Sequence, residues 1–112
     1  MNTLPQPVRQ ISPKELKKKL ENGEQLTLID VREQNEREIA NLGGDLIPMS
    51  TVLDNLARIP RDGTVIVYCR SGGRSGKVVE ALQKQCGYTN LWNLDGGILR
   101  WSDDVDGSVQ KY

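Results

Sequence analysis

One cysteine stands where an apolar, β-branched run meets a loop rich in glycine and arginine. Residues 65–68 read Val-Ile-Val-Tyr, and the chain continues as Cys69-Arg70-Ser71-Gly72-Gly73-Arg74-Ser75. Gly72 and Gly73 let successive backbone N–H groups turn inward, and the helical pattern that follows adds the partial positive charge of a helix N-terminus. Arg70 and Arg74 add full charges. Such surroundings favour a thiolate and bind anions, so the segment predicts a nucleophilic cysteine.

The chain has 112 residues, two cysteines and no histidine. Without histidine, no Cys-His pair or Ser-His-Asp triad can form within this chain. Activation of Cys69 must therefore come from the loop backbone, the helix terminus and the arginines. Cys69 and Cys86 fit neither a zinc signature nor a disulfide framework, and we expect no metal and no cofactor. Cys86 is expected in the core, with a resolving or regulatory thiol as the alternative.

Two other interpretations of this loop fit its residues less well. The P-loop pattern fails, because Ser71 and Val78 stand where it requires Gly and Ser or Thr around Gly76-Lys77. A buried core thiol followed by an ordinary turn is the simpler alternative, since free cysteine is often just buried. The flanking arginines and glycines favour the functional interpretation.

Short strands and short helices alternate along the rest of the chain. This alternation predicts an α/β fold with a mostly parallel five-stranded sheet, in which ligands bind at the carboxyl ends of the strands. Cys69 follows the strand with the most continuous apolar run. Strands are expected at residues 8–11, 26–31, 46–48, 64–68 and 91–94, and helices at 13–22, 34–40, 51–59, 75–85 and 98–104.

Two local features sharpen these expectations. Ser12, Pro13 and Glu15 form the pattern of a capping box with proline at the first helical position. In the helix at 51–59, the inward residues are expected to be Val52, Leu53, Leu56 and Ile59.

Composition narrows the functional classes. The formal net charge is zero, which gives no support for nucleic-acid or anionic-membrane binding. No apolar run approaches the roughly 20 residues that span a bilayer, and because the first residues lack the charged and apolar regions of a signal peptide, we expect none there. We expect a single cytoplasmic domain that acts as a monomer.

Three motifs resemble the rhodanese (sulfurtransferase) family over residues 8–106. They are the loop from Cys69 to Ser75, the segment Leu28-Ile29-Asp30-Val31-Arg32-Glu33, and the closing Asp95-Gly96-Gly97-Ile98 with Trp101. The segment Asn41-Leu42-Gly43-Gly44-Asp45 departs from the family pattern. The resemblance implies a three-layer sandwich, with residues 1–7 as a tail or linker and residues 107–112 as a C-terminal tail.

The resemblance also implies a chemical role for each residue of the loop. Cys69 would accept a sulfane sulfur as a persulfide and pass it to a thiophilic acceptor. The backbone of Arg70, Ser71, Gly72, Gly73, Arg74 and Ser75 would hold the persulfide, and Arg70 with Arg74 would steer a small anionic donor such as thiosulfate. Asp30 and Arg32 would give structural support, because a carboxylate in an apolar strand needs a partner.

Two alternatives share this architecture. Dual-specificity phosphatases and related arsenate reductases use a cysteine loop that is one residue longer, whereas here Arg74 follows Cys69 after four residues and Ser75 stands at the longer spacing. The shorter loop suits one sulfur better than a tetrahedral oxyanion, and the loop offers no acid for a leaving oxygen. A non-catalytic module that only binds partners is the third interpretation, and it predicts a replaced cysteine.

The last residues suggest a context. Residues 97–112 resemble the end of rhodanese domains appended to E1-like adenylyltransferases, which serve ubiquitin-like sulfur-carrier proteins. Either of these proteins would then be a partner, and residues 1–7 would be the linker to an adenylation domain. A free-standing thiosulfate sulfurtransferase is the alternative.

Overall fold

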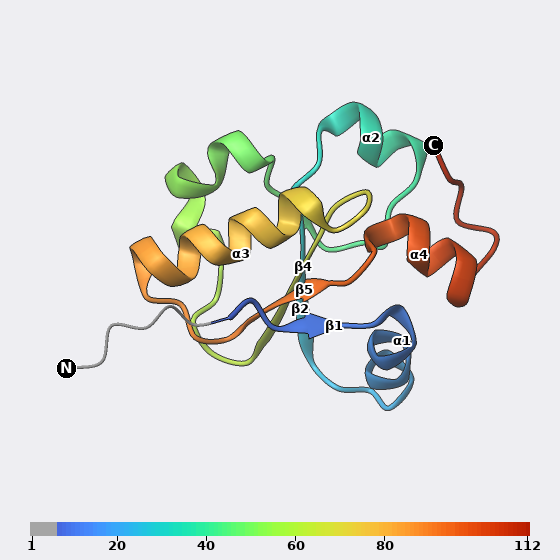
Figure 1. Cartoon of the computed structure of the whole chain (residues 1–112), viewed down its shortest axis with the longest axis horizontal. Coiled ribbons are helices and arrows are strands. Elements are labelled where there is room, and N and C mark those ends of the chain that lie inside the picture. The colour runs from blue at the N-terminus through green and yellow to red at the C-terminus, as the bar shows by residue number, and fades with distance from the viewer. Residues whose placement is uncertain (1–6) are drawn as a thin grey trace.

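The computed structural model describes residues 7–112, and it is built around one sheet (Figure 1). Five strands lie in the order β1-β5-β4-β2-β3, and every neighbouring pair is parallel. The predicted α/β class with a mostly parallel five-stranded sheet is therefore confirmed. The strands are β1 (Gln10–Ile11), β2 (Leu26–Asp30), β3 (Asp45–Leu46), β4 (Thr64–Tyr68) and β5 (Leu91–Leu94).

Helices cover both faces of the sheet and complete the three layers (Figure 1). One face packs against α3 and η1, and the other packs against α1 and α4. Successive residues of β4 explain its unbroken apolar run, because Val65 and Val67 enter the first core while Ile66 and Tyr68 enter the second. The helices are α1 (Pro13–Glu21), α2 (Gln34–Ile39), η1 (Met49–Arg58), α3 (Gly73–Cys86) and α4 (Gly97–Asp104).

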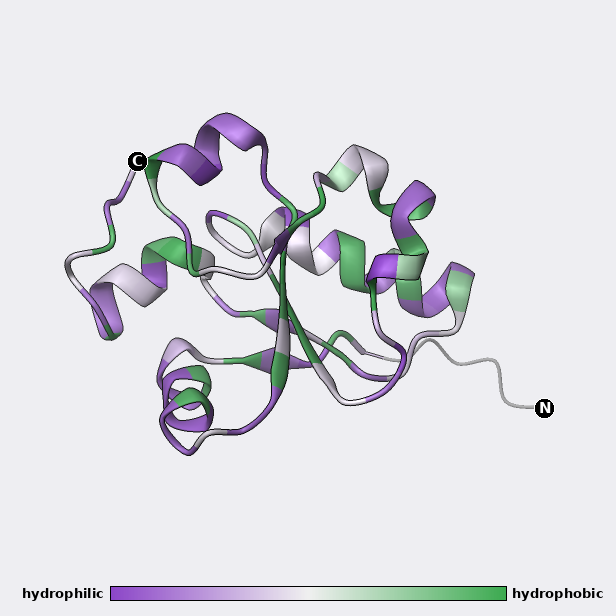
Figure 2. Cartoon of the chain, turned by 180° about the vertical axis from the view of Figure 1, so that it is seen from behind, coloured by the Kyte–Doolittle hydropathy of each residue, from purple (hydrophilic) through white to green (hydrophobic). Residues whose placement is uncertain are grey.

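The helix α2 is the exception to this layering. It buries none of its residues, and Figure 2 shows it almost uniformly hydrophilic, in contrast to the hydrophobic runs of the central strands. A six-residue polar helix has little stability of its own, so α2 must be held by contacts from neighbouring segments. Those contacts come from residues of the candidate site described below.

Two of the five predicted helix starts, at Pro13 and Gln34, agree with the structure. The predicted capping box is confirmed: the Glu15 N–H donates to Ser12 Oγ at 3.1 Å, and the Ser12 N–H donates to Glu15 Oε1 at 3.0 Å. Strand β1 begins at Gln10 rather than at residue 8, and β3 occupies Asp45–Leu46 rather than 46–48. The helix α3 begins two residues earlier than expected, at Gly73.

The helix predicted at residues 51–59 is a 3₁₀ helix at Met49–Arg58, and its predicted inward face is wrong at Leu53. Residues 49–58 form 3₁₀ turns that are interrupted at Asn55, whose φ is −126° and ψ is 27°. Because this break removes the α-helical spacing, Leu53 points outward and is 56% exposed, while Val52 and Ile59 remain buried. Leu56 is partly buried against the core.

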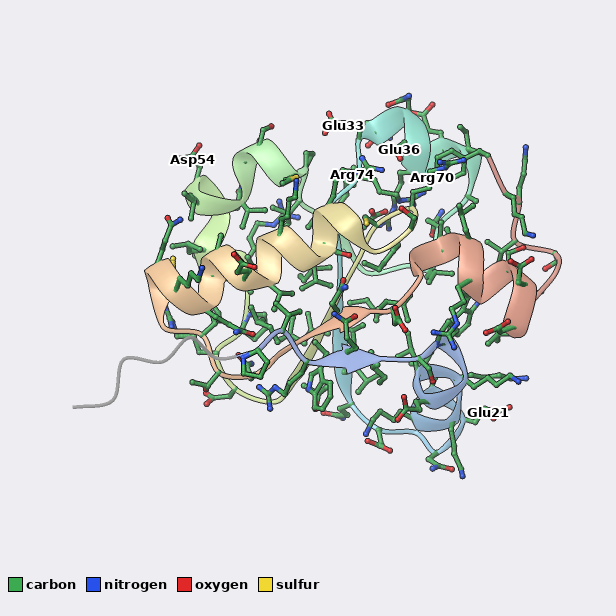
Figure 3. All side chains as sticks on the ribbon, viewed as in Figure 1. Glu21, Glu33, Glu36, Asp54, Arg70 and Arg74 are labelled. Carbon is green, nitrogen blue, oxygen red and sulfur yellow. The ribbon has the colours of Figure 1, made fainter. Side chains whose placement is uncertain are left out.

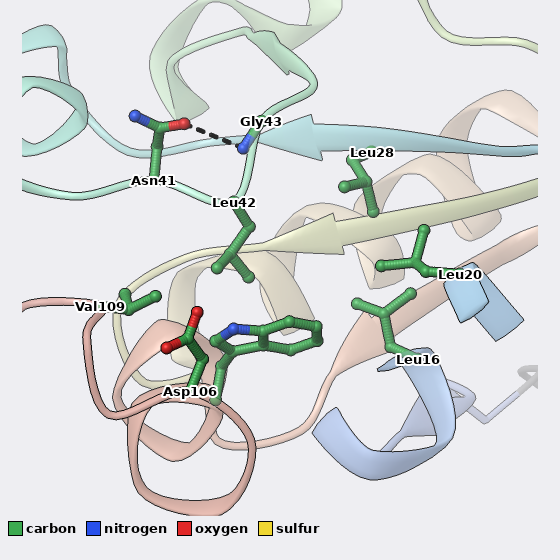
Figure 4. Close-up of a pocket in the computed structure, with 9 residues that line it drawn as sticks. Leu16, Leu20, Leu28, Asn41, Leu42, Gly43, Asp106 and Val109 are labelled. Carbon is green, nitrogen blue, oxygen red and sulfur yellow. Dashed lines mark hydrogen bonds between the residues drawn. The ribbon is translucent and has the colours of Figure 1, made fainter. Parts of the chain in front are cut away.

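An apolar groove lies on the face covered by α1 and α4 (Figure 4). It has a volume of about 320 Å³, and Leu16, Leu28, Leu42 and Trp101 are among its lining residues. Leu20, one turn after Leu16 on α1, also lines the groove and is 43% exposed. The groove includes no residue of the cysteine loop.

The predicted linker at residues 1–7 falls, except for Pro7, outside the described residues. Residues 107–112 fold back on the domain, with Ser102 Oγ donating to the Val109 carbonyl oxygen at 2.7 Å. Within residues 7–112, no helix has both the length and the apolar character that crossing a bilayer requires.

Candidate active site

The cysteine lies at the carboxyl end of the middle strand of the sheet. Cys69 directly follows β4 and is only 1% exposed. A short loop then leads into α3, so the N-terminus of a 14-residue helix stands beside the thiol. This is the edge of a parallel sheet at which ligands bind in open α/β folds.

Three hydrogen-bond donors converge on the sulfur. The backbone N–H of Gly72 lies 3.1 Å from Cys69 Sγ, and the backbone N–H of Ser75 lies 3.4 Å from it. The Ser75 hydroxyl oxygen lies 3.3 Å from the same atom. Donors that face a sulfur in this way stabilise negative charge on it, whether the sulfur is a thiolate or carries an anionic adduct.

The two loop glycines have different roles. Gly72 adopts φ 100°, a left-handed conformation that favours glycine, and a Cβ atom there would lie 3.2 Å from the Gly96 backbone nitrogen. Gly73 is instead the first helical residue of α3, so the expectation that both glycines supply unusual backbone angles is wrong. Ser71 and Gly73 are exposed.

The closing Asp-Gly-Gly segment and the start of α4 hold the cysteine loop through backbone hydrogen bonds. The backbone N–H groups of Ile98 and Leu99, at the start of α4, donate to the carbonyl oxygens of Cys69 and Arg70, both at 3.0 Å. A Cβ atom at Gly97 would lie 2.5 Å from the Arg70 carbonyl oxygen, so this close approach requires glycine. Two of the three recognised motifs therefore meet in space.

Arg74 is held by a carboxylate that the sequence did not single out. Its Nη1 and Nη2 donate to Glu36 Oε1 and Oε2 at 2.7 and 2.8 Å, which is a bidentate ion pair between α3 and α2 (Figure 3). The hydrogen bonds from Arg74 lower the pKa of Glu36 to about 2, and the same pair raises the pKa of Arg74. Arg74 also interacts electrostatically with Cys69.

Tyr112 connects the tail to the rim of the site. Its hydroxyl donates to Glu36 Oε2 at 2.7 Å and accepts from Arg32 Nη1 at 2.8 Å, and burial raises the pKa of this hydroxyl. Arg70 Nε donates to the Tyr112 carbonyl oxygen at 2.6 Å, and the Arg70 guanidinium lies 5.2 Å from the Tyr112 ring centroid. Both arginines of the loop are therefore positioned through contacts with α2 or the tail.

Asp30 and Arg32 form a fully buried pair beside the site. Both side chains are 0% exposed, and Arg32 Nε and Nη2 donate to the two Asp30 oxygens at 2.9 Å each. Arg32 Nη2 also donates to the Ala40 carbonyl oxygen at 2.7 Å, and Nη1 donates to the Glu36 carbonyl oxygen at 3.3 Å. Arg32, fixed by Asp30, thus holds the end of α2. This contact is consistent with the structural support expected of the two residues.

The loop at residues 41–45, which departs from the family pattern, is held by a tyrosine that precedes the cysteine. The Tyr68 hydroxyl donates to the Gly43 carbonyl oxygen at 2.8 Å and accepts from the Leu42 N–H at 3.1 Å. Burial, with a further effect from Asp30, raises the pKa of Tyr68 to about 12, so the hydroxyl keeps its proton and remains a donor.

Sequence reasoning missed three residues that touch the site. Glu36 and Tyr112 look like ordinary surface residues in the sequence, and only the fold brings them to the arginines. Asn93 had a signal, because it is the one polar residue in the run Leu91-Trp92-Asn93-Leu94. Cys86, in contrast, lies at the end of α3, partly exposed and packed against the core.

Acid should weaken the link between α2 and α3. Since the pKa of Glu36 is about 2 in the folded protein and 4.5 without its partners, the ion pair stabilises the fold above pH 4.5 and is lost as the pH falls toward 2. Glu36→Gln should therefore lower the free energy of unfolding by about 1 kcal/mol at neutral pH, a figure discounted for the partial exposure of Arg74. Urea titrations at several pH values should show this difference shrinking from pH 4.5 to 2. Glu80→Gln, which breaks an exposed pair with Lys84, is the control. A difference independent of pH would contradict the account.

Comparisons with known proteins place this geometry in a family. The Rhodanese-like domain model matches residues 12–104. The chain is 36% identical over 105 residues to the probable adenylyltransferase/sulfurtransferase MoeZ of Mycobacterium tuberculosis, covering 91% of this chain but 26% of that protein. It is 34% identical to a sulfurtransferase of Allochromatium vinosum, covering 85% of this chain and 89% of that protein.

A solved structure agrees with these relatives. The rhodanese-like domain protein from Staphylococcus aureus superposes with a TM-score of 0.78 at 30% identity, over 94% of this chain and 99% of that one. The chain spans about a quarter of the length of MoeZ but most of the length of the other two proteins. With the family model matched over most of its residues and the cysteine loop at the expected edge of the sheet, the chain belongs to the rhodanese-like domain family.

Proposed function

We propose that this protein is a sulfurtransferase that takes a sulfane sulfur from thiosulfate onto Cys69 and passes it to a thiophilic acceptor. The observation that carries the proposal is the convergence of the Gly72 N–H and the Ser75 N–H and hydroxyl on Cys69 Sγ. The family and the relatives named sulfurtransferases support sulfur transfer in general.

The chemistry proceeds in two displacements. The Cys69 thiolate attacks the sulfane sulfur of thiosulfate; a new S–S bond forms, the S–S bond of thiosulfate breaks, and sulfite leaves with the electron pair. The enzyme then carries an anionic persulfide, and backbone N–H groups of the loop stabilise its charge. A thiophilic acceptor attacks the outer sulfur, and the Cys69 thiolate is the leaving group.

The two loop arginines are proposed to capture the anionic donor. Among residues 7–112, two of the five guanidinium N–H groups of Arg74 bind Glu36, which leaves the others for an anionic donor. Arg74→Ala should therefore raise the KM for thiosulfate about tenfold with a smaller effect on kcat, measured by steady-state kinetics. Arg61→Ala removes an arginine that stacks on Tyr88 before the amino end of β4, and it should leave KM unchanged. An unchanged KM in Arg74→Ala would rule out this role.

We further propose a protein acceptor. The relative MoeZ is named as both an adenylyltransferase and a sulfurtransferase, which supports a ubiquitin-like sulfur carrier, or the E1-like enzyme that activates it, as the partner. A small thiol is the simpler acceptor, as expected for a free-standing sulfurtransferase.

Two parallel assays test the proposed reaction. The protein is incubated with thiosulfate and cyanide, and thiocyanate is measured; a parallel sample receives p-nitrophenyl phosphate. Thiocyanate formation without phosphate release supports the proposal. Hydrolysis of the phosphate ester without thiocyanate would replace it with the phosphatase alternative, and neither product would favour a binding module.

A further inference from the structure

An amide side chain lies buried beneath the cysteine loop. Asn93 is 4% exposed and pairs with Val67 of β4 and Gln10 of β1. It belongs to the sheet face that packs on α3, where Leu91 and Val67 are apolar. A buried amide in such a place costs free energy unless every polar atom is paired, so its partners are informative.

The partners of Asn93 fix its orientation. Its Nδ2 donates to the Gly72 carbonyl oxygen at 3.1 Å and to Gln10 Oε1 at 3.0 Å, which uses both hydrogens. Since the Gly72 carbonyl can only accept, Nδ2 must face it, and Oδ1 must face the Ser75 hydroxyl. The structure shows that hydrogen bond from Ser75 Oγ to Asn93 Oδ1.

Two glycines make room for the amide. A Cβ atom at Gly76 would lie 3.4 Å from Asn93 Nδ2, and one at Gly72 would lie 3.8 Å from it. The first turn of α3, which follows the cysteine loop, therefore packs closely against the Asn93 amide.

The Ser75 hydroxyl has two possible acceptors but one hydrogen. Its oxygen bonds Asn93 Oδ1 and lies 3.3 Å from Cys69 Sγ. The hydrogen can point to Asn93 or to the sulfur, but not to both at once. While Cys69 keeps its proton, the hydroxyl can donate to Asn93 and accept from the thiol. Once that proton has left to solvent, donation to the charged sulfur is the stronger bond.

We propose that Asn93 is a positioning residue for Cys69, and that it acts by competing with the sulfur for the hydrogen of the Ser75 hydroxyl. Asn93 holds this hydrogen away from the neutral thiol and releases it when the thiolate forms. Removing the competing acceptor leaves the hydroxyl free to donate to the sulfur at all times. The inference rests on Cys69 being the reactive thiol of the proposed function.

The charged groups around the loop stay unchanged in the variants that test this idea. They are Arg70 in the loop, Arg74 on α3, Glu36 on α2, the Asp30–Arg32 pair after β2, and Asp95 with Arg100 at α4.

The test measures the rate of Cys69 alkylation by iodoacetamide, which requires no sulfur transfer. It is done in a Cys86→Ser background, because Cys86 is partly exposed. Asn93→Leu should react about fivefold faster than its parent near pH 6, with the pH profile of alkylation moved to lower pH. If this variant does not fold, Asn93→Val is measured in its place with the same expectation.

Ser75→Ala shows whether Asn93 affects Cys69 through the Ser75 hydroxyl or only by supporting the fold. If Asn93 acts through Ser75, adding Asn93→Leu to Ser75→Ala should not change the alkylation rate further. Asn90→Leu is the matched control, because Asn90 also donates to two carbonyl oxygens, those of Pro60 and Gly63, but at the far end of β5. It should lower stability and leave alkylation unchanged. An unchanged or slower rate in Asn93→Leu, or an effect that persists without the Ser75 hydroxyl, would overturn the proposal.

Discussion

Cys69→Ser should lower the rate of thiocyanate formation from thiosulfate and cyanide by roughly three orders of magnitude or more. The structure gives the physical reason. Hydrogen-bond donors on Gly72 and Ser75 can stabilise a charged sulfur at this position, but a serine hydroxyl does not ionise near neutral pH and forms no persulfide. The fold should remain intact, because serine is smaller than cysteine and can accept from the same donors.

The matched control is the second cysteine. Cys86 lies at the other end of α3, so Cys86→Ser should keep the rate within about twofold of the parent. Circular dichroism should show both variants folded. A folded Cys69→Ser variant with substantial transfer activity, or a large loss in Cys86→Ser, would place the nucleophile elsewhere.

Asp30→Ala should destabilise the protein by about 3–5 kcal/mol, the usual cost of removing one partner of a buried ion pair. The pair is fully buried, and loss of the carboxylate leaves the Arg32 guanidinium without the two hydrogen bonds that it donates to Asp30. Arg32 would also lose its hold on the Ala40 and Glu36 carbonyl oxygens, so α2 should loosen first. Denaturant titration measures the loss.

Two further variants test whether the loss of stability in Asp30→Ala comes from leaving a buried charge without its partner. Lys84→Ala breaks an exposed pair with Glu80 and should cost less than about 1 kcal/mol. The double variant Asp30→Leu, Arg32→Met removes both charges, and it should recover part of the stability lost in Asp30→Ala. A loss in Asp30→Ala no larger than in Lys84→Ala would show that the buried pair is not what holds α2.

The parts of the fold that depend on local signals could be predicted from the sequence. The capping box at Ser12 involves residues three positions apart, and the apolar run before Cys69 defines its strand without reference to any other segment. The position of the cysteine at the carboxyl end of a central strand followed from this run and from the alternation of strands and helices.

The partners of the arginines could not be predicted, because they come from distant segments. Glu36 is 38 residues from Arg74, and Tyr112 is 42 residues from Arg70. No helical or strand periodicity in the sequence relates the two residues of either pair. The outward Leu53 failed for another reason: the α-helical spacing assumed for its segment does not survive the 3₁₀ turns and the break at Asn55.

The central claim is that Cys69 carries the transferred sulfur, and the intact mass of the protein after incubation with thiosulfate tests it most directly. The account predicts a gain of one sulfur atom that is absent in Cys69→Ser and is discharged by cyanide. No gain in mass, or the same gain in Cys69→Ser, would contradict it.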